Sequence, residues 1–273
     1  MTRIRSKFAA LICALFVVAA TLSARAGAGA APARIPILVY HRFGPRVADS
    51  MTVRTAVFAA QLRFLKDHHI TVVPLRVVTR YFLNEGPPPP PNSIAITADD
   101  GHRTVFTEMA PLVRQYRIPV TLFIYPSAIS NASYAMTWSE LSELKAGGLF
   151  DIQSHTYWHP NFHIEKRRRD PGGYRKFVND QLIASKKRLE DRLGGTVDML
   201  AWPFGIYDDE LIELARRAGY VAAFSIERRP ASTRDNVMAL PRYLMTDADR
   251  GEAFARIVEA EPAVSRSRSQ TNR

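Results

Sequence analysis

Two adjacent carboxylates, Asp99 and Asp100, directly follow an apolar run at residues 93–98, and a glycine comes after them. A carboxylate can accept a proton from an attacking water or bind a divalent cation, so an adjacent pair could do both. An Asp-Gly pair after an apolar run can also be the turn of a β-hairpin. A hairpin needs a second strand, however, and residues 102–116 have the apolar spacing of a helix. We therefore expect a strand, a loop and a helix, with both carboxylates in or beside the loop.

Two histidines, His155 and His159, follow a second apolar run at residues 150–154. Histidines at positions i and i+4 share one side of a helical turn and can bind one metal ion, although unrelated surface histidines also show this spacing. Pro160 disfavours helical geometry at His159, so we expect a loop or a single turn. One carboxylate and two imidazoles would make an open site for zinc or a similar divalent cation. The second carboxylate would then be free to act as a base.

The elements that would position these residues alternate in type along the chain. Apolar runs predict strands at residues 35–40, 71–74, 93–98, 120–124, 150–154, 199–202, 221–225 and 240–244. Helices are expected at residues 57–67, 75–84, 102–116, 137–147, 174–193, 208–218 and 249–260. The segment at residues 160–173 reads as irregular. This alternation predicts a single α/β domain with an irregular (β/α) barrel of about seven strands, and it brings the strand ends to one edge.

The N-terminus has the pattern of a secretory signal peptide. A basic start precedes an apolar segment at residues 8–22, and Ala-Arg-Ala follows at residues 24–26. We expect cleavage after Ala26. The alternative is an uncleaved membrane anchor, but the apolar run is short for a span. The sole cysteine, Cys13, lies in this segment, so the mature chain can form no disulfide.

Composition limits the classes of function. The chain has 273 residues, 47% of them hydrophobic, which suffices for a large core. Removing residues 1–26 takes away four basic residues and no acidic one, so the formal charge falls from +11 to +7. Much of the local basic excess lies at residues 166–169 and 265–268, where a solvated loop and a disordered tail are the preferred interpretations. No nucleic-acid recognition motif accompanies the charge, and none of these features predicts a nucleic-acid partner.

Three motifs in chain order resemble those of the polysaccharide deacetylases, carbohydrate esterase family 4. They are Thr-Ala-Asp-Asp-Gly at residues 97–101, Ser-His-Thr-Tyr-Trp-His at residues 154–159 and Pro-Phe-Gly at residues 203–205. The resemblance extends over most of the mature chain. It implies a distorted (β/α) barrel that hydrolyses an N-acetyl group on a sugar polymer.

The resemblance also implies a role for each matching residue. Asp99 would be the general base. The ligands of a divalent metal, zinc before cobalt, nickel or iron, would be Asp100, His155 and His159. The backbone N–H of Phe204 would help to hold the oxyanion, and Pro203 and Tyr157 would belong to the same substrate-binding region.

The chain departs from the family motifs at three places. Ala98 replaces the usual phenylalanine before the aspartates, the arginine usual ahead of the third motif is absent, and no Leu-x-x-His motif follows near the C-terminus. Leu-Val-Tyr-His at residues 38–41 resembles the circularly permuted biofilm poly-β-1,6-N-acetylglucosamine deacetylases, in which the acid histidine comes first. This would make His41 the proton donor. Arg242 could replace the missing arginine as the partner of Asp99, although a surface arginine is an equal alternative.

These features predict an exported, metal-dependent hydrolase that removes N-acetyl groups from a polysaccharide, with poly-β-1,6-N-acetylglucosamine as the preferred polymer. Chitin oligosaccharides and peptidoglycan are alternative substrates, and a catalytically inactive polysaccharide-binding relative is a further alternative. The domain boundaries expected are a signal peptide at residues 1–26, a catalytic domain at residues 27–262 and a disordered basic tail at residues 263–273. The mature chain would be periplasmic or secreted, without a stable membrane span, and its protein partners are not predicted.

Overall fold

The computed structural model describes residues 33–259. The predicted signal peptide and the predicted basic tail therefore lie outside the described residues, as do both ends of the predicted catalytic domain. Within residues 33–259, no helix is both long enough and apolar enough to cross a membrane.

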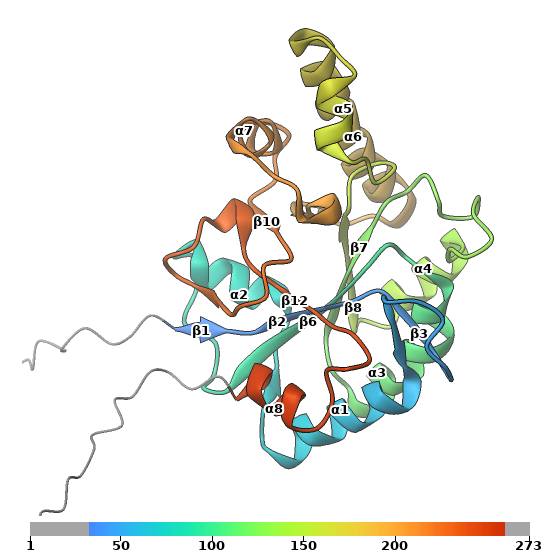
Figure 1. Cartoon of the computed structure of the whole chain (residues 1–273), viewed down its shortest axis with the longest axis vertical. Coiled ribbons are helices and arrows are strands. Elements are labelled where there is room, and N and C mark those ends of the chain that lie inside the picture. The colour runs from blue at the N-terminus through green and yellow to red at the C-terminus, as the bar shows by residue number, and fades with distance from the viewer. Residues whose placement is uncertain (1–32, 260–273) are drawn as a thin grey trace, which may run out of the picture. The chain divides into compact units, whose positions relative to one another are not determined.

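A curled sheet of parallel strands forms the centre of the domain (Figure 1). Its strands, in spatial order, are β10 (Ala222–Phe224), β9 (Met199–Ala201), β8 (Phe150–Ser154), β7 (Val120–Ile124), β6 (Ser93–Asp99), β2 (Ile37–Tyr40) and β12 (Tyr243–Leu244), and β5 (Thr71–Val72) pairs beside β6. This sheet confirms the predicted distorted barrel of about seven strands. Two short pairs lie outside it: β1 (Arg34–Ile35) with β11 (Ala231–Ser232), and β3 (Arg42–Gly44) with β4 (Thr52–Arg54).

The segment that leads into β12 connects the two edges of the sheet. Leu240 forms an isolated parallel bridge with Phe224 of β10. Three residues later, Tyr243 pairs with Leu38 of β2. Residues 240–244 thus span the gap between the edge strands, and Arg242 lies in the middle of this span. The predicted strand at residues 240–244 is regular over its last two residues alone.

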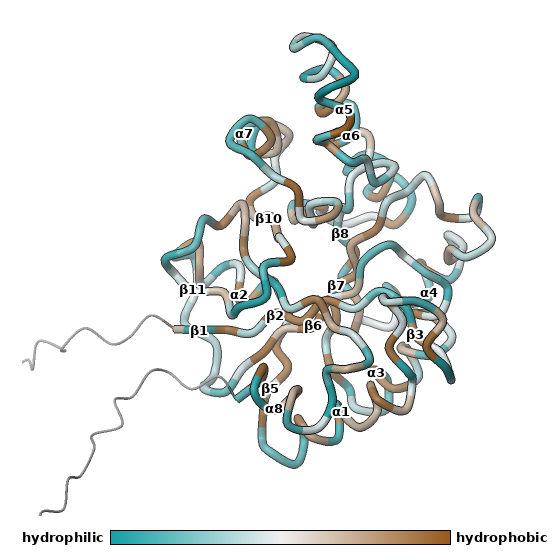
Figure 2. The backbone as a smooth tube through the Cα atoms, viewed as in Figure 1, coloured by the Kyte–Doolittle hydropathy of each residue, from teal (hydrophilic) through white to brown (hydrophobic). Residues whose placement is uncertain are grey.

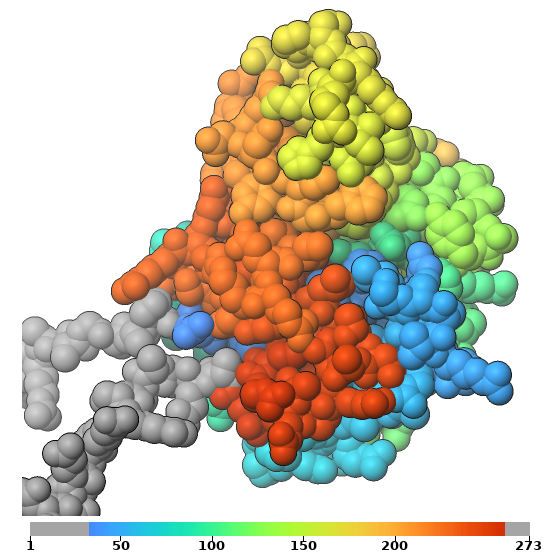
Figure 3. Space-filling view, in the orientation of Figure 1, coloured from blue at the N-terminus to red at the C-terminus, as the bar shows by residue number. Residues whose placement is uncertain are grey.

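The C-terminal part of the domain also packs against the segment that contains β3 and β4. Figure 3 shows the red C-terminal surface directly beside the blue surface of this segment. An ion pair joins the two, with 2.9 Å between Arg54 Nε and Asp247 Oδ1.

Helices surround the sheet, as the alternating pattern predicts. They are α1 (Thr55–Asp67), α2 (Leu75–Phe82), α3 (Ala110–Tyr116) after a π-helical turn η1 (Val105–Met109), α4 (Trp138–Ala146), α5 (Phe162–Arg167), α6 (Pro171–Leu193), α7 (Asp209–Arg217) and α8 (Glu252–Val258). Short 3₁₀ turns are η2 (Pro203–Gly205) and η3 (Val237–Ala239). A capping box starts α4, with the Thr137 side chain accepting a hydrogen bond from the Glu140 N–H.

Successive side chains of a strand point to opposite faces of the sheet, and this alternation separates an inner core from an outer core. Ile94 and Ile96 of β6 belong to the large cluster that packs under the helices. Ala95 belongs to a smaller cluster inside the barrel, together with Ile37 of β2. In Figure 2, the brown colour along these central strands marks their hydrophobic residues. The same alternation puts Asp99 on the inner face with Ala95.

The prediction of an irregular segment at residues 160–173 was wrong in part. Residues Phe162–Arg167 form α5, because the Asn161 side chain accepts a hydrogen bond from the Ile164 N–H at 3.1 Å. A second cap starts α6 earlier than predicted, since Asp170 accepts from the Gly173 N–H at 3.0 Å. Both caps satisfy free N–H groups of a helix start, and they outweigh the polar, basic composition that suggested a loop.

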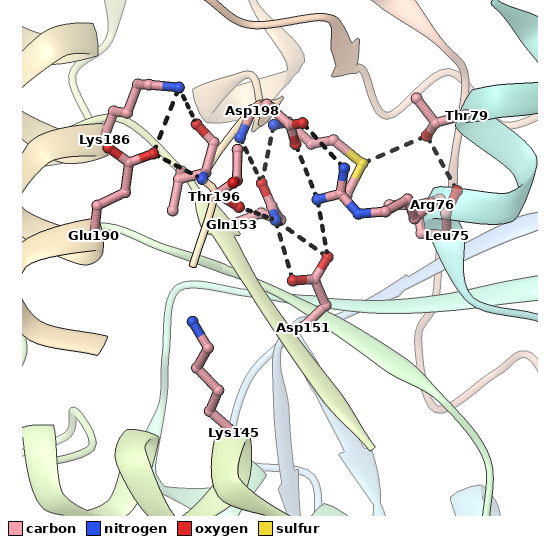
Figure 4. Close-up of polar contacts among 12 residues, drawn as sticks. Leu75, Arg76, Thr79, Lys145, Asp151, Gln153, Lys186, Glu190, Thr196 and Asp198 are labelled. Carbon is pink, nitrogen blue, oxygen red and sulfur yellow. Dashed lines mark hydrogen bonds and ion pairs between the residues drawn. The ribbon is translucent and has the colours of Figure 1, made fainter. Parts of the chain in front are cut away.

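A hydrogen-bond network ties β8, β9 and α2 together around Asp151, near the start of β8, and Asp198, directly before β9 (Figure 4). Gln153 Nε2 donates to both oxygens of Asp151 at 3.1 Å. Gln153 Oε1 accepts from the backbone N–H groups of Asp198 at 3.0 Å and Met199 at 2.9 Å. Arg76 of α2 donates twice to Asp198, at 3.0 Å each. We call Arg76, Asp151, Gln153 and Asp198 the amino-end network.

Candidate metal centre and catalytic cavity

The predicted polar residues meet at the carboxyl ends of the parallel strands. Asp99 is the last residue of β6, and His41 and His155 directly follow β2 and β8. These three side chains, together with Asp100 and His159, line one cavity of 340 Å³. Active sites of (β/α) barrels lie at this end, because the loops there come from many strands. We call it the catalytic cavity.

Asp100, His155 and His159 form a compact set of potential metal ligands. Asp100 Oδ1 lies 3.6 Å from His155 Nε2 and 3.8 Å from His159 Nε2. This oxygen is buried and has no hydrogen-bond partner. The Nδ1 atom of His155 lies 2.8 Å from the Ala201 carbonyl oxygen, so Nδ1 carries the proton and Nε2 keeps its lone pair. An unpaired carboxylate oxygen beside two imidazole nitrogens fits a divalent cation of the zinc type.

The backbone around this set is held in an uncommon conformation. Three residues that are not glycine have positive φ: Asp100 at 72°, Thr156 at 63° and His159 at 62°. This left-handed region is unfavourable for a side chain branched at Cβ, such as that of Thr156. Such strain concentrates at functional sites, where the surrounding structure holds it in place. Here the residues with positive φ lie in the two loops that carry all three potential ligands.

Asp99 forms a fully buried ion pair with Arg242. The two guanidinium NH groups lie 2.9 Å from Asp99 Oδ1 and 2.7 Å from Oδ2. Arg242 also donates to the Ser225 carbonyl at 3.0 Å and to the Thr97 hydroxyl at 3.1 Å. Burial alone would raise the pKa of Asp99, but the charge and the hydrogen bonds of Arg242 hold this pKa below its ordinary value. Asp99 is therefore ionised at neutral pH.

The position of Arg242 excludes one sequence alternative. The side chain has no exposed surface, so it is not a surface arginine. It enters the barrel because it lies in residues 240–244, which span the two sheet edges. Its partner Asp99 is on the inner face of β6. Arg242 thus reaches Asp99 from the segment that leads into β12, remote in sequence from the third motif.

His41 lines the same cavity with one ring nitrogen unpaired. Its Nδ1 atom is buried and has no hydrogen-bond partner. Burial lowers the pKa of His41, and the carboxylates of Asp99 and Asp100 oppose this effect in part. The lowered pKa favours the neutral imidazole, whose unpaired ring nitrogen faces no group of the described chain.

The three residues expected to contact substrate differ in position. Phe204 lines the catalytic cavity, has φ of 56° and leaves 55% of its side chain exposed. Its ring packs edge to face against that of His159, with 4.5 Å between the ring centroids. Pro203 and Tyr157 are not among the residues that line the cavity. The Tyr157 carbonyl instead accepts a hydrogen bond from the Ser127 N–H at 3.0 Å.

Sequence analysis missed two aromatic residues of the cavity wall, Tyr125 and Trp202. The ring centroid of Tyr125 lies 5.5 Å from that of His159. Tyr125 directly follows β7 and Trp202 directly follows β9. His41 and His155 have this same position after their strands. Examining the first residue after every predicted strand would have identified Tyr125 but not Trp202, because the strand predicted at residues 199–202 is one residue longer than β9.

Comparisons with known proteins agree with this fold and show the family. Residues 86–223 match the sequence model of the family described as polysaccharide deacetylase. The poly-β-1,6-N-acetyl-D-glucosamine N-deacetylase of Staphylococcus aureus strain MRSA252 is 23% identical over 225 residues, which are 81% of this chain and 76% of that protein.

Two solved structures share the fold. The deacetylase PplD of Streptococcus pyogenes superposes with a TM-score of 0.74 and 21% identity, covering 83% of this chain and 99% of that one. IcaB of Ammonifex degensii superposes with a TM-score of 0.70 and 21% identity, covering 83% of this chain and 97% of that one.

Proposed function

This chain belongs to the polysaccharide deacetylase family, and we propose that it is an exported, metal-dependent N-deacetylase acting on poly-β-1,6-N-acetylglucosamine. The observation that carries the proposal is the catalytic cavity, where an Asp-His-His ligand set lies beside an aspartate paired with a buried arginine. The family defines the reaction as removal of acetyl groups from a polysaccharide. Export, the metal and the polymer are our additions.

Two observations support the choice of polymer. A relative that covers 81% of this chain is named for poly-β-1,6-N-acetylglucosamine. In addition, His41 comes from the first strand of the central sheet, as the permuted motif order requires. Chitin oligosaccharides and peptidoglycan contain the same acetamide group, so the cavity chemistry alone favours none of the three.

Asp100, His155 and His159 would hold the metal. A divalent cation bound there would supply Lewis-acid polarisation of the acetamide carbonyl. Zinc is our first choice, and cobalt, nickel and iron also accept this mixture of oxygen and nitrogen ligands. Because His155 Nδ1–H is engaged by the Ala201 carbonyl, the ring is already oriented with Nε2 toward the other ligands.

The residues of the chain divide the proton transfers. Asp99 accepts a proton from the attacking water, whose oxygen adds to the acetyl carbon, and Arg242 keeps Asp99 ionised and oriented. The backbone N–H of Phe204 stabilises the developing oxyanion. His41 donates a proton to the amine nitrogen as the C–N bond breaks. Acetic acid and a free amino sugar leave, and the proton held by Asp99 is returned to His41 through solvent, so atoms and charge balance.

The decisive experiment measures acetate release by the chain from residue 27 onward, with zinc added and after chelation. The substrates are poly-β-1,6-N-acetylglucosamine, chitin oligosaccharides and peptidoglycan. We expect zinc-dependent release that is fastest from the first polymer. Asp99→Asn and His41→Ala should each lower the rate by about 10²–10⁴-fold, the usual contribution of general acid–base catalysis. Arg114→Gln, which breaks an exposed ion pair with Glu143, is the control.

Each part of the proposal can fail separately. Faster acetate release from chitin or peptidoglycan would contradict the proposed polymer and leave the proposed deacetylation reaction intact. Acetate release that continues after chelation would contradict the proposed metal dependence. No release from any polymer, with binding retained, would favour the polysaccharide-binding alternative. Export is tested by sequencing the N-terminus of the chain recovered outside the cytoplasm, which should begin at Gly27.

A further inference from the structure

A second cavity, of 570 Å³, adjoins the catalytic cavity, because Arg42 lines both. Its walls come from β3, from the loop between β3 and β4, and from the residues before η1. Both cavities have volumes in the range of small-molecule sites, roughly 300–1,000 Å³. Neither the catalytic residues nor the metal ligands reach the second cavity.

Arg42 has a donor that no group of the described chain uses. Its Nε atom is buried and lacks a hydrogen-bond partner. One terminal NH group pairs with Asp49 Oδ2. Asp49 cannot rotate to serve Nε as well, since its Oδ1 accepts from the Met51 N–H at 3.0 Å and the Thr52 hydroxyl at 2.8 Å. A buried donor without an acceptor is unfavourable, so this position suits an oxygen supplied by a ligand.

The opposite wall is also fixed and polar. The Thr104 hydroxyl oxygen accepts from the Phe43 N–H at 2.9 Å, so its own hydrogen is available for His102 Nδ1 at 2.8 Å. His102 then carries its proton on Nε2, which is a second donor. The His102 ring is nearly parallel to that of Tyr134, at 14° with 5.9 Å between centroids. Arg42 and His102, which both line the second cavity, therefore supply N–H donors, and Tyr134 packs against the His102 ring from outside the lining.

These features suit an oxygen-rich ligand. The charge of Arg42 is already balanced by Asp49, so an anion would gain little from it. Hydroxyl and acetamide oxygens need donors of this kind and no net charge. We propose that the second cavity binds the sugar unit next to the one being deacetylated, with Arg42 donating to an oxygen at the junction. This inference rests on the proposed function, which places the reacting sugar in the catalytic cavity.

The inference assigns distinct roles to the residues at the junction. Arg42 contacts the polymer, while Asp49 is a positioning residue that holds the guanidinium in place. Ala48 lines the second cavity and does not line the catalytic one. Substituting Ala48 by a large residue therefore obstructs the second sugar without adding volume beside the metal ligands.

The test compares kcat/KM for N-acetylglucosamine with kcat/KM for its β-1,6-linked dimer, trimer and tetramer. For the unmodified protein, we expect a clear rise from monomer to dimer. Arg42→Gln should lower the ratio of dimer to monomer by about tenfold, the effect of one hydrogen bond to a charged group. Ala48→Trp should lower this ratio at least about tenfold, because the larger side chain obstructs the second sugar. The control Arg114→Gln should leave this ratio unchanged. Circular dichroism melting establishes that each variant is folded.

Equal losses on monomer and oligomers, or a ratio that does not change, would overturn the subsite and leave the deacetylase proposal intact. Calorimetric binding of the tetramer to the same variants separates the remaining cases. Binding without turnover, weakened about tenfold by both substitutions, would support the subsite and contradict the proposed function. Neither binding nor turnover for any sugar would contradict both.

Discussion

The two ends of the barrel contain the same kinds of polar residue but satisfy them differently. At the catalytic cavity, His41 Nδ1, Arg42 Nε and Asp100 Oδ1 are buried without a hydrogen-bond partner. In the amino-end network, the side-chain amide of Gln153 bonds through both its oxygen and its nitrogen. The unpaired atoms lie where a metal and a sugar would bind, and the paired ones lie where three elements join. Polar groups thus serve binding at one end and stability at the other.

Backbone conformation follows the same division. Asp100, Thr156, His159 and Phe204 all have positive φ, and all lie at or beside the catalytic cavity. No residue of the amino-end network has positive φ. Strain at a functional site lowers stability, so substitutions there should reduce activity more than stability. Substitutions in the amino-end network should do the reverse.

The largest effect is expected for Arg242→Ala, which breaks this division by affecting both properties. The substitution leaves Asp99 buried and charged without a partner, so the free energy of unfolding should fall by about 3–5 kcal/mol. Acetate release should also disappear. Urea denaturation and an acetate assay measure the two losses. The double variant Arg242→Ala/Asp99→Asn should regain part of the stability and none of the activity. A single variant as stable as the unmodified chain would contradict the buried ion pair.

Gln153→Ala should separate the two ends. It leaves the N–H groups of Asp198 and Met199 without their acceptor, which should cost about 1–3 kcal/mol of stability for each buried group left unpaired. The turnover of the remaining folded protein should not change, because Gln153 does not line the catalytic cavity. Denaturation in urea and kcat at low temperature test this pair of outcomes. A large loss of kcat in fully folded protein would show that the ends are coupled.

Gly205→Ala tests strain next to the cavity. Gly205 has φ of 68°, and an added Cβ would lie 2.6 Å from Ile226 Cγ1. We expect a loss of about 1–3 kcal/mol in stability together with lower activity, since both strain and crowding act here. Gly148→Ala is the matched control, because its φ is 75° and nothing lies within 4 Å of an added Cβ. Equal losses in the two variants would mean that crowding by Ile226 contributes nothing.

The smallest change in stability is expected for Asp100→Asn. Asparagine tolerates positive φ as well as aspartate does, so the backbone should keep its conformation. Since Asp100 Oδ1 has no hydrogen bond to lose, the melting temperature without metal should stay the same or rise. Zinc affinity, measured by competition with a chelating dye, should drop at least about tenfold, along with acetate release. A strongly destabilised variant would show that this carboxylate has a structural role.

Local patterns in the sequence predicted the parts of the site that depend on single elements. The apolar run before Asp99 was enough to predict a strand without knowledge of its neighbours. The cap of α4 is equally local, because Thr137 bonds to a residue three positions away. The same reasoning missed α5, because Asn161 and a basic segment resemble a loop when its packing is unknown. A local signal is sufficient when the stabilising contact is itself local.

The pairing of Asp99 with Arg242 needed more than a local pattern. The two residues are 143 positions apart, and nothing around Arg242 in the sequence distinguishes a buried arginine from an exposed one. Its burial follows from the way residues 240–244 join both edges of the sheet. Sequence analysis could name the residue as a candidate and could not choose between the alternatives. The cavities, which combine side chains from many loops, were equally beyond local reasoning.

The late position of Arg242 also has a consequence for the growing polypeptide. A nascent chain that has been synthesised as far as β9 already contains Asp99, Asp100 and both histidines of the metal site. It still lacks the cation that balances Asp99 and the segment that joins the sheet edges. Burying a carboxylate without that cation is unfavourable. We therefore expect the carboxyl end of β6 to remain exposed to water until residues 240–244 have been synthesised. Catalytic competence is therefore acquired in one late step, and prematurely terminated chains carry every motif without an assembled site.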